Sequence, residues 1–408
     1  MVVKIKGNKL WIIVSCILLL VIIITSVTNI ISPKHITIKD VTSNKSNIIQ
    51  QNTKLNFENI RGVWVPYFSL QTEKGTKKEF ENNFDKIVNT AKKNKMNTLV
   101  VHIRPFADAV YKSSIFPISH IITGTQGEKI DYDPLEYMVN TAHKNGLKFH
   151  AWINPYRIST KDTPYKLAEN SIVNQLEEID ILEYDGGKYI NPSSSKGRKL
   201  IINGVQEVVK NYDIDGIHFD DYFYPTSKTE IDNASYQEYI SSLDKECIPL
   251  TQYEWRKTNV NMLISSVYSI IKQEKKDVLF GISPQGNIDN CTEIGADIAT
   301  WCNTNSYVDY ICPQLYVNFE HSSSPFDAML KQWLEICKNS NISFSVGLAL
   351  YKANSDYDDG TWKNSDNILE QQVKLCQENN INNFIFYDID YFTNKNTVKE
   401  VENLMPVL

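Results

Sequence analysis

Hydrophobic and polar positions divide the chain into an apolar N-terminal run, a short polar stretch and a long alternating region. Residues 10–31 form an almost uninterrupted apolar run without a charge, and residues 1–9 before it carry three lysines. About 20 apolar residues span a bilayer as a helix, and a basic flank favours the cytoplasmic side. We therefore expect a cytoplasmic basic tail over 1–9 and a transmembrane anchor over 10–31.

A cleaved signal peptide is the alternative interpretation of the apolar run. Its apolar core would span about 7–15 residues and end in a small-x-small site, and no such site stands near residues 28–32. We therefore favour a single-pass membrane protein with its main domain outside the cytoplasm over a secreted one. Residues 32–59 are polar and without a period, which predicts a flexible linker.

From residue 60 to 408 the pattern alternates between short apolar runs, typical of buried strands, and longer amphipathic segments with helical spacing. The expected strands lie within 62–68, 97–105, 147–156, 215–225, 278–284, 308–316, 344–351 and 383–388. A helical segment follows each of them, which favours a parallel sheet. Eight such units predict one domain with the α/β fold class of a (β/α)₈ TIM barrel. A doubly wound open sheet is the alternative, but no phosphate-cradling glycine motif follows any strand.

Composition narrows the range of partners. The net charge is -6 among 408 residues, which argues against nucleic acid, because phosphate binding requires a basic face. The seven cysteines show no CxxC spacing, so there is no zinc or redox signature. A disulfide between Cys337 and Cys376 stays open, and so does the oligomeric state.

The segment 215–225, DGIHFDDYFYP, is the strongest candidate for a chemical site. Its strand ends in two adjacent carboxylates followed by aromatic rings, and buried carboxylates are costly unless they are paired or used. Strand alternation puts His218, Asp220 and Tyr222 on one face. We expect Asp220 to point into the barrel mouth and to be catalytic, with Asp221 as its partner. In the alternative, Asp221 caps the next turn and Asp220 forms a salt bridge with an arginine.

Active sites of TIM barrels lie at the C-terminal ends of the strands, where polar and aromatic residues gather in this chain. The candidate substrate-binding residues at or just after these ends are Arg104, Asp108, Trp152, Asn154, Arg157, His218, Tyr222, Gln314, Tyr316 and Tyr351. Two long connections, 158–195 and 223–253, are expected to shape a binding cleft.

Two carboxyl groups at a strand end fit glycoside hydrolysis, which needs one acid and one nucleophile or base. We expect Asp220 to be the nucleophile or base; Asp108, Glu293, Asp297 and Asp388 are further candidates for the second carboxyl. A zinc site formed by His102, His150 and His218 with Asp220 is an alternative, but we predict neither metal nor cofactor. A glycan-binding module without catalysis is another alternative.

Several segments together resemble the glycosyl-hydrolase-like family 10. They include RGVWV near residue 61, HIRPFADAVYKSSIFP from 102, YDPLEYMVNTAHKNGLKFHAWINPYR from 132, DGIHFDDYFYP and VDYICPQLY from 308. The resemblance spans about 61–352 and implies a TIM-barrel glycosidase outside the cytoplasm that acts on a polysaccharide, a cell-wall glycan of peptidoglycan type. The chain departs from the family over 285–289 and in its last strand, so Asp388 is not carried over. Tyr222 stands where chitinase-like barrels have a catalytic Glu, so substrate-assisted chemistry is not expected.

Overall fold

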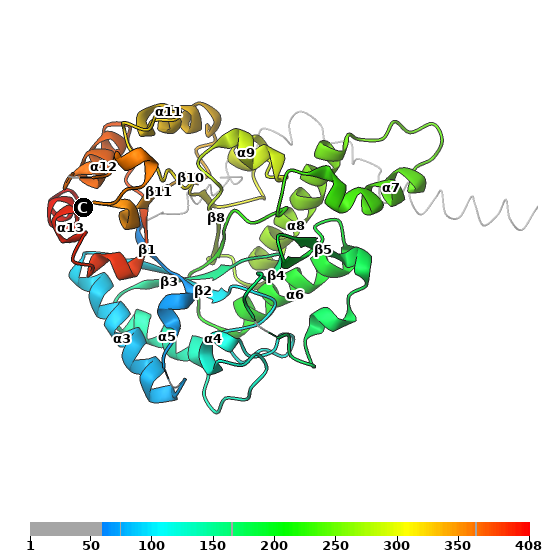
Figure 1. The fold of residues 1–408 in the computed structure, drawn as a ribbon, viewed down its shortest axis with the longest axis horizontal. Helices are drawn as coiled ribbons and strands as arrows, with labels where there is room; N and C mark the ends of the chain where they lie inside the picture. Colours follow the sequence, from blue (N-terminus) through cyan, green and yellow to red (C-terminus); the bar gives the residue numbers. More distant parts are fainter. Residues whose placement is uncertain (1–58, 74, 165, 364) are drawn as a thin grey trace, which may run out of the picture. The chain divides into compact units, whose positions relative to one another are not determined.

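The computed structural model describes residues 59–73, 75–164, 166–363 and 365–408 (Figure 1). The predicted basic tail, the predicted anchor and all but the last residue of the predicted linker lie outside the described residues. Within the described part of the chain, none of the helices is both long and apolar enough to cross a membrane.

The main sheet is entirely parallel and has nine strands. They are β1 (Arg61–Val65), β2 (Thr98–Arg104), β3 (Lys148–Ile153), β7 (Gly216–Phe219), β8 (Leu279–Ile282), β9 (Tyr310–Ile311), β10 (Ser343–Phe344), β11 (Val346–Ala349) and β12 (Phe384–Tyr387). Their order in the sheet is β10-β9-β8-β7-β3-β2-β1-β12-β11. The predicted parallel sheet is thus confirmed.

The two ends of this order meet, because only Ser345 separates β10 from β11. The backbone N–H of Ser345 donates to the Ile311 carbonyl at 2.9 Å, and that of Gly347 donates to the Pro313 carbonyl at 2.9 Å. On its other side β11 pairs with β12. The strands therefore form a nearly closed barrel of the TIM type, in which β10 and β11 together occupy the place of the predicted strand 344–351.

Helices surround the sheet (Figure 1). The longer ones are α3 (Lys77–Lys93), α5 (Pro134–Lys144), α6 (Ser195–Asn211), α7 (Asn233–Ser242), α8 (Gln252–Glu274), α11 (Phe326–Ile336) and α12 (Ile368–Glu378), and shorter ones are α4 (His120–Thr123), α9 (Ile288–Glu293), α10 (Ile298–Asn303) and α13 (Val398–Leu404). Side-chain caps start several of them, among them Thr76 for α3 and Asp133 for α5, where Pro134 follows the cap. Each cap satisfies N–H groups that lack a partner within the helix.

Strand alternation separates two hydrophobic layers. Leu99, Val101 and Ile103 of β2 belong to the large cluster that includes the surrounding helices. Val100 belongs to a second cluster with Ile60, Trp64, Trp152, Tyr310, Cys312 and Ile385. Side chains of alternate strand positions fill the interior of such barrels, so this second cluster forms the floor beneath the strand ends.

The two long connections contain structure of their own. The first carries a small antiparallel sheet with the order β4-β6-β5, formed by β4 (Arg157–Ser159), β5 (Ile181–Tyr184) and β6 (Gly187–Ile190). Asp185 and Gly186 connect β5 to β6 with positive φ angles of 47° and 74°, as tight hairpins favour. The second carries the 3₁₀ helix η4 (Thr229–Asp232) and helix α7. The six cysteines in the described residues, Cys337 and Cys376 included, are unpaired.

Candidate active site

Asp220 follows β7 directly and is buried beside Trp152 of the neighbouring strand β3. The indole Nε1–H of Trp152 donates to Asp220 Oδ2 at 2.9 Å. The backbone N–H of Tyr222 donates to Oδ1 at 3.4 Å. Ile217 and Phe219 of the same strand pack in the outer cluster. Alternation therefore turns Asp220 and His218 toward the interior of the barrel, as the pattern predicted.

Burial, together with the nearby charge of Asp221, raises the pKa of Asp220 to about 7. The charge of Arg157 and the hydrogen bond from Trp152 lower the pKa but do not offset the loss of solvation. Desolvation disfavours the charged form of a carboxyl group. A carboxylic acid with this pKa still holds a proton near neutral pH and can act as a general acid.

Asp221 is held by different residues from those that hold Asp220. Nε2 of Gln314 donates to Asp221 Oδ1 at 3.0 Å and to the Ser283 carbonyl at 3.0 Å. Burial raises the pKa of Asp221, whereas hydrogen bonds from Gln314 and Gln285 lower it. Within the described residues neither Asp220 nor Asp221 has a lysine or arginine within ion-pair distance, so the predicted alternative of a salt bridge at Asp220 is not seen.

Arg157 lies close to both carboxyl groups and lowers the pKa of each. Its guanidinium lies over the Phe106 ring at 4.9 Å and over the Tyr222 ring at 5.3 Å. Its Nε donates to the Pro105 carbonyl at 2.8 Å, and its backbone N–H donates to Asn154 Oδ1 at 3.0 Å. The structure therefore brings Asn154, Arg157 and Tyr222 together at the mouth.

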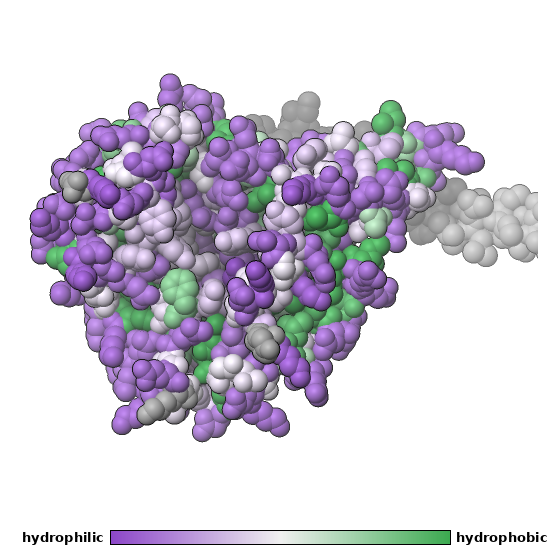
Figure 2. Space-filling view, in the orientation of Figure 1, coloured by the Kyte–Doolittle hydropathy of each residue, from purple (hydrophilic) through white to green (hydrophobic). Residues whose placement is uncertain are grey.

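Aromatic rings form the opposite side of the mouth. The ring centroid of Tyr316 lies 6.4 Å from Trp64, 6.0 Å from Tyr351 and 6.0 Å from Tyr387. In Figure 2 the middle of the visible face is hollowed and bordered by residues of intermediate hydropathy. Tyrosine and tryptophan offer both an apolar face and a polar atom, which suits a sugar ring. Trp64 and Tyr387 were missed in the sequence, although both lie on strands that end at this rim.

A chain of hydrogen bonds fixes the floor under Asp220. Trp64 Nε1–H donates to His218 Nε2 at 3.3 Å, so His218 carries its proton on Nδ1, which lies 2.8 Å from the Tyr310 hydroxyl. That hydroxyl also lies 2.9 Å from His150 Nδ1. Burial lowers the pKa of His218 and brings that of His150 to about 4, so both rings are neutral.

The three histidines of the zinc hypothesis instead contact aromatic side chains. His150 and His218 share the Tyr310 hydroxyl, and His102 stacks on Trp152 with ring centroids 3.7 Å apart. In the part of the chain that the structure describes, no group of three or more His, Cys, Asp or Glu side chains is arranged to hold a metal ion.

Two predicted binding residues, Arg104 and Asp108, lie apart from the residues at the mouth of the barrel. The register shifts between His102 and Arg104, and the buried guanidinium of Arg104 lies over Phe116 at 4.7 Å and next to Gly204 of α6. Asp108 is also buried; its Oδ2 accepts from Gln126 at 2.9 Å and lies 3.2 Å from His120 Nδ1. The shift turns this end of β2 toward α6, which alternation alone could not predict.

The other candidates for the second carboxyl have structural contacts of their own. Asp297 accepts hydrogen bonds from the Thr300 backbone N–H and from Asn261, and Glu293 is exposed at the end of α9. Asp388 is buried, its Oδ1 accepts from the backbone N–H of Asp390, and burial raises its pKa to about 7. Among the candidates, Asp221 is the residue adjacent to Asp220 with an amide donor aimed at it.

A parallel barrel of the TIM type, with two differently held carboxyl groups and a wall of rings at its strand ends, defines a glycosidase-like α/β barrel. The chain belongs to the family described as Glycosyl hydrolase-like 10, whose model matches residues 59–364. The predicted family is thus confirmed. The match includes Asp220 and Asp221 and ends before Tyr387.

Similar proteins carry related descriptions. The chain is 33% identical over 340 residues to "Glycosyl hydrolase YngK" of Bacillus subtilis, covering 76% of this chain and 64% of that protein. It is 33% identical over 282 residues to "Glycosyl hydrolase DigH" of Escherichia coli K12, covering 63% of each. The chain thus spans less than two thirds of the length of these relatives.

A solved structure has the same fold. The glycoside hydrolase domain of PgaB (BpsB) from Bordetella bronchiseptica aligns with a TM-score of 0.54 at 12% identity, covering 86% of this chain and 99% of that domain. At this identity the similarity concerns the fold alone.

Proposed function

We propose that the protein is a glycoside hydrolase that cleaves O-glycosidic bonds in a polysaccharide, and that this polysaccharide is a cell-wall glycan of the peptidoglycan type. The observation that carries the proposal is the adjacent pair Asp220 and Asp221, held apart by Trp152 on one side and Gln314 on the other. Family membership supports hydrolysis. The substrate class rests on the resemblance of the sequence motifs.

In the proposed reaction Asp220 is the general acid, which reverses the role that the sequence suggested for it. Asp220 protonates the oxygen of the leaving sugar, because its raised pKa keeps a proton available. Asp221 is the ionised partner and acts as nucleophile or general base. Gln314 stabilises its charged form by donating a hydrogen bond. Arg157 lies near both groups and limits the repulsion between them.

The residues around the pair have the chemistry of sugar recognition. Asn154 has a buried Nδ2 with no protein partner in the described residues, so it can donate to a sugar hydroxyl. Tyr222 is 47% exposed and lies beside Asp220, where its ring can stack on a sugar. Tyr316 and Tyr351 form the facing wall. We propose in addition that residues 10–31 anchor the protein in the cell membrane and hold the barrel outside the cytoplasm.

Activity is expected to fall as the pH rises through about 7, since Asp220 must hold its proton and its pKa is raised to about 7. On the acid side activity is expected to fall as Asp221 becomes protonated. Burial raises the pKa of Asp221, so this fall should occur at a higher pH than the ordinary pKa of an aspartate. Initial rates between about pH 4 and about pH 9 measure both limbs. Trp152→Phe removes a hydrogen bond that favours ionised Asp220, so the alkaline limb should move to higher pH. An unmoved limb contradicts its assignment to Asp220.

The function is tested by incubating the full chain with purified wall glycans, with and without their peptides, and identifying the products by mass. New reducing ends from wild type, absent with Asp220→Asn, support hydrolysis. Binding without release of reducing ends favours the alternative of a glycan-binding module. Activity that a chelator abolishes favours the metal-dependent alternative, whereas activity that survives the chelator excludes it.

A further inference from the structure

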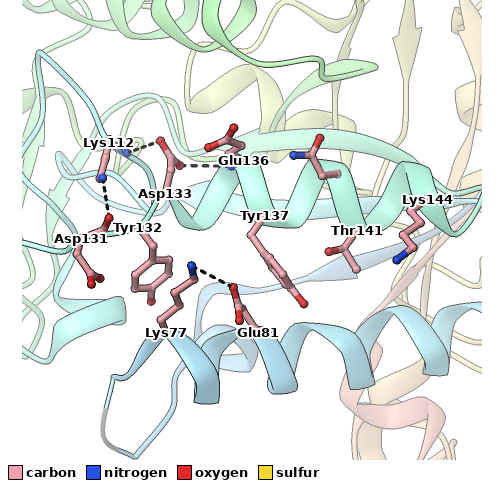
Figure 3. Close-up of a pocket in the computed structure, with 11 residues that line it drawn as sticks. Lys77, Glu81, Lys112, Asp131, Tyr132, Asp133, Glu136, Tyr137, Thr141 and Lys144 are labelled. Carbon is pink, nitrogen blue, oxygen red and sulfur yellow. Dashed lines mark hydrogen bonds and ion pairs between the residues drawn. The ribbon is translucent and has the colours of Figure 1, made fainter.

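Two of the cavities in the described residues lie away from the mouth, and they differ in the chemistry of their lining. The first, of about 510 Å³, lies between α3 and α5 and is drawn in Figure 3. Lys77, Lys112 and Lys144 line it together with acidic residues, and Lys77 pairs with Glu81. It is an ordinary charged groove between two barrel helices.

The second cavity, of about 350 Å³, has no lysine or arginine in its lining. It lies between residues 193–195 at the start of α6, helix α7 and the first turns of α8. Five serines, an aspartate, a glutamate, an asparagine and two aromatic side chains provide most of its surface. Hydroxyl, carboxylate and amide groups with aromatic rings and no cation form a lining suited to an uncharged polyhydroxylated ligand.

The aromatic part of this pocket is rigid before any ligand arrives. The ring of Tyr239 lies 5.9 Å from Trp255 at an angle of 29°. Its hydroxyl accepts from the backbone N–H of Leu250 at 3.1 Å, and the neighbouring Tyr236 hydroxyl donates to the Leu250 carbonyl at 2.6 Å. A wall held in this way loses little conformational entropy when it binds.

One amide in the lining is buried. Asn259 is 4% exposed, and its side chain forms a hydrogen bond with the Tyr224 hydroxyl that lowers the pKa of Tyr224. The amide nitrogen of an asparagine carries two N–H donors, so a ligand hydroxyl in the pocket can accept from the second one.

The pocket is connected to the candidate active site through the same two segments of chain. Arg157 of the mouth pairs across β4 and β6 with Tyr189, and Ser193 of the pocket follows four residues later. Asp221 and Tyr222 begin the other connection, which continues through η4 to α7. Both connections leave the C-terminal ends of parallel strands, so pocket and mouth lie on the same side of the barrel.

We infer that this second cavity is a saccharide-binding site that holds a distant part of the same glycan chain whose bond lies at Asp220. The inference rests on the proposed function for the identity of the ligand. The ligand class is an uncharged sugar unit, bound by the hydroxyls of the serines, by Asn259 and by the face of Tyr239. Such a site increases the effective concentration of a long chain at the mouth.

The test is isothermal titration of the full-length Asp220→Asn protein, which does not consume the probe, with a β-1,4-linked N-acetylglucosamine tetrasaccharide. We expect two binding sites per chain. Adding Ser242→Trp, an exposed position that fills the pocket, or Tyr239→Ala, which removes its wall, should leave one. Tyr137→Ala in the groove of Figure 3 is the matched control and should leave two.

The outcomes separate this inference from the proposed function. If Asp220→Asn shows one binding site and adding Ser242→Trp removes it, the result supports the pocket but contradicts binding at the mouth. One or two sites that neither Ser242→Trp nor Tyr239→Ala reduces overturns the inference and leaves the mouth standing. Absence of all binding overturns both for this ligand class. When Asp220 is retained, the variants Ser242→Trp and Tyr239→Ala should hydrolyse long glycans several-fold more slowly than wild type. They should hydrolyse short glycans at an unchanged rate.

Discussion

Replacing Asp220 with Asn is expected to lower kcat for glycan hydrolysis by about 10²- to 10⁴-fold, the range over which a general acid contributes. Asn keeps the size of the side chain and can still accept the hydrogen bond from Trp152 Nε1, but it cannot give a proton to a leaving group. Binding of the glycan should change little, because the wall of rings is untouched. Release of reducing ends over time measures kcat, and titration measures binding.

The same substitution has a second expected result, on stability. The pKa of Asp220 in the folded protein, about 7, lies above its ordinary value of 3.8, so ionising this group destabilises the fold. The contribution that Asp220 makes when protonated is fully present below about pH 4 and is lost as the pH rises through about 7. Asp220→Asn removes the charge, so the variant should melt at a higher temperature than wild type at pH 8 and at a similar temperature at pH 4.

Asp213→Asn is the matched control, because Asp213 lies just before the same strand with its side chain 89% exposed. It should change neither kcat nor the pH dependence of melting. A variant Asp220→Asn that retains wild-type kcat excludes Asp220 as the acid. Equal melting temperatures of Asp220→Asn and wild type at pH 8 would show that the charge is not buried as the structure indicates.

Replacing Arg256 with Met is expected to lower the free energy of unfolding by about 3–5 kcal/mol, since it leaves a buried carboxylate without its counter-ion. Arg256 and Asp232 are both fully buried and joined by two hydrogen bonds of 2.8 and 2.6 Å. The guanidinium also donates to the carbonyls of Thr226, Ser227 and Lys228. It therefore ties α8 to the connection that begins at Asp221, and urea unfolding measures the loss.

Two further variants isolate the cause of that loss. Lys257→Met, one residue further along α8, breaks only a partly exposed pair with Glu254 and should cost at most about 1 kcal/mol. The double variant Asp232→Leu with Arg256→Met removes both charges, so it should recover part of the stability lost by Arg256→Met alone. A double variant less stable than Arg256→Met would contradict an uncompensated charge as the cause.

The fold was predictable from the sequence because its signal is local and repeated. Each strand is an apolar run and each helix has its own period and start signal, as with Asp133 and Pro134 before α5. What the sequence did not show was the structure inside the long connections. The hairpin of β5 and β6 was only marked by Asp185 and Gly186. The pocket beside α7 depends on packing between segments that lie between Ile179 and Asn259.

The candidate site was predictable where the alternation along a regular strand decides which way a side chain points. It correctly turned Asp220 and His218 inward, since His218 lies on a regular strand and Asp220 follows it directly. It did not show that Arg104 turns toward α6, because a register shift interrupts β2. Nor could it show which side chains hold the two aspartates, since Trp152 lies on β3 and Gln314 follows β9.

The amino-acid sequence alone determined the family, the alternating barrel architecture and the strand end that carries the aspartate pair, because hydrophobic periodicity and motif spacing are properties of neighbouring residues. Only the tertiary structure decided which side chains hold the two aspartates, which rings face the pair and where a second cavity opens. Burial, desolvation and hydrogen-bond partners arise when segments far apart in the chain come together, and no local pattern contains them.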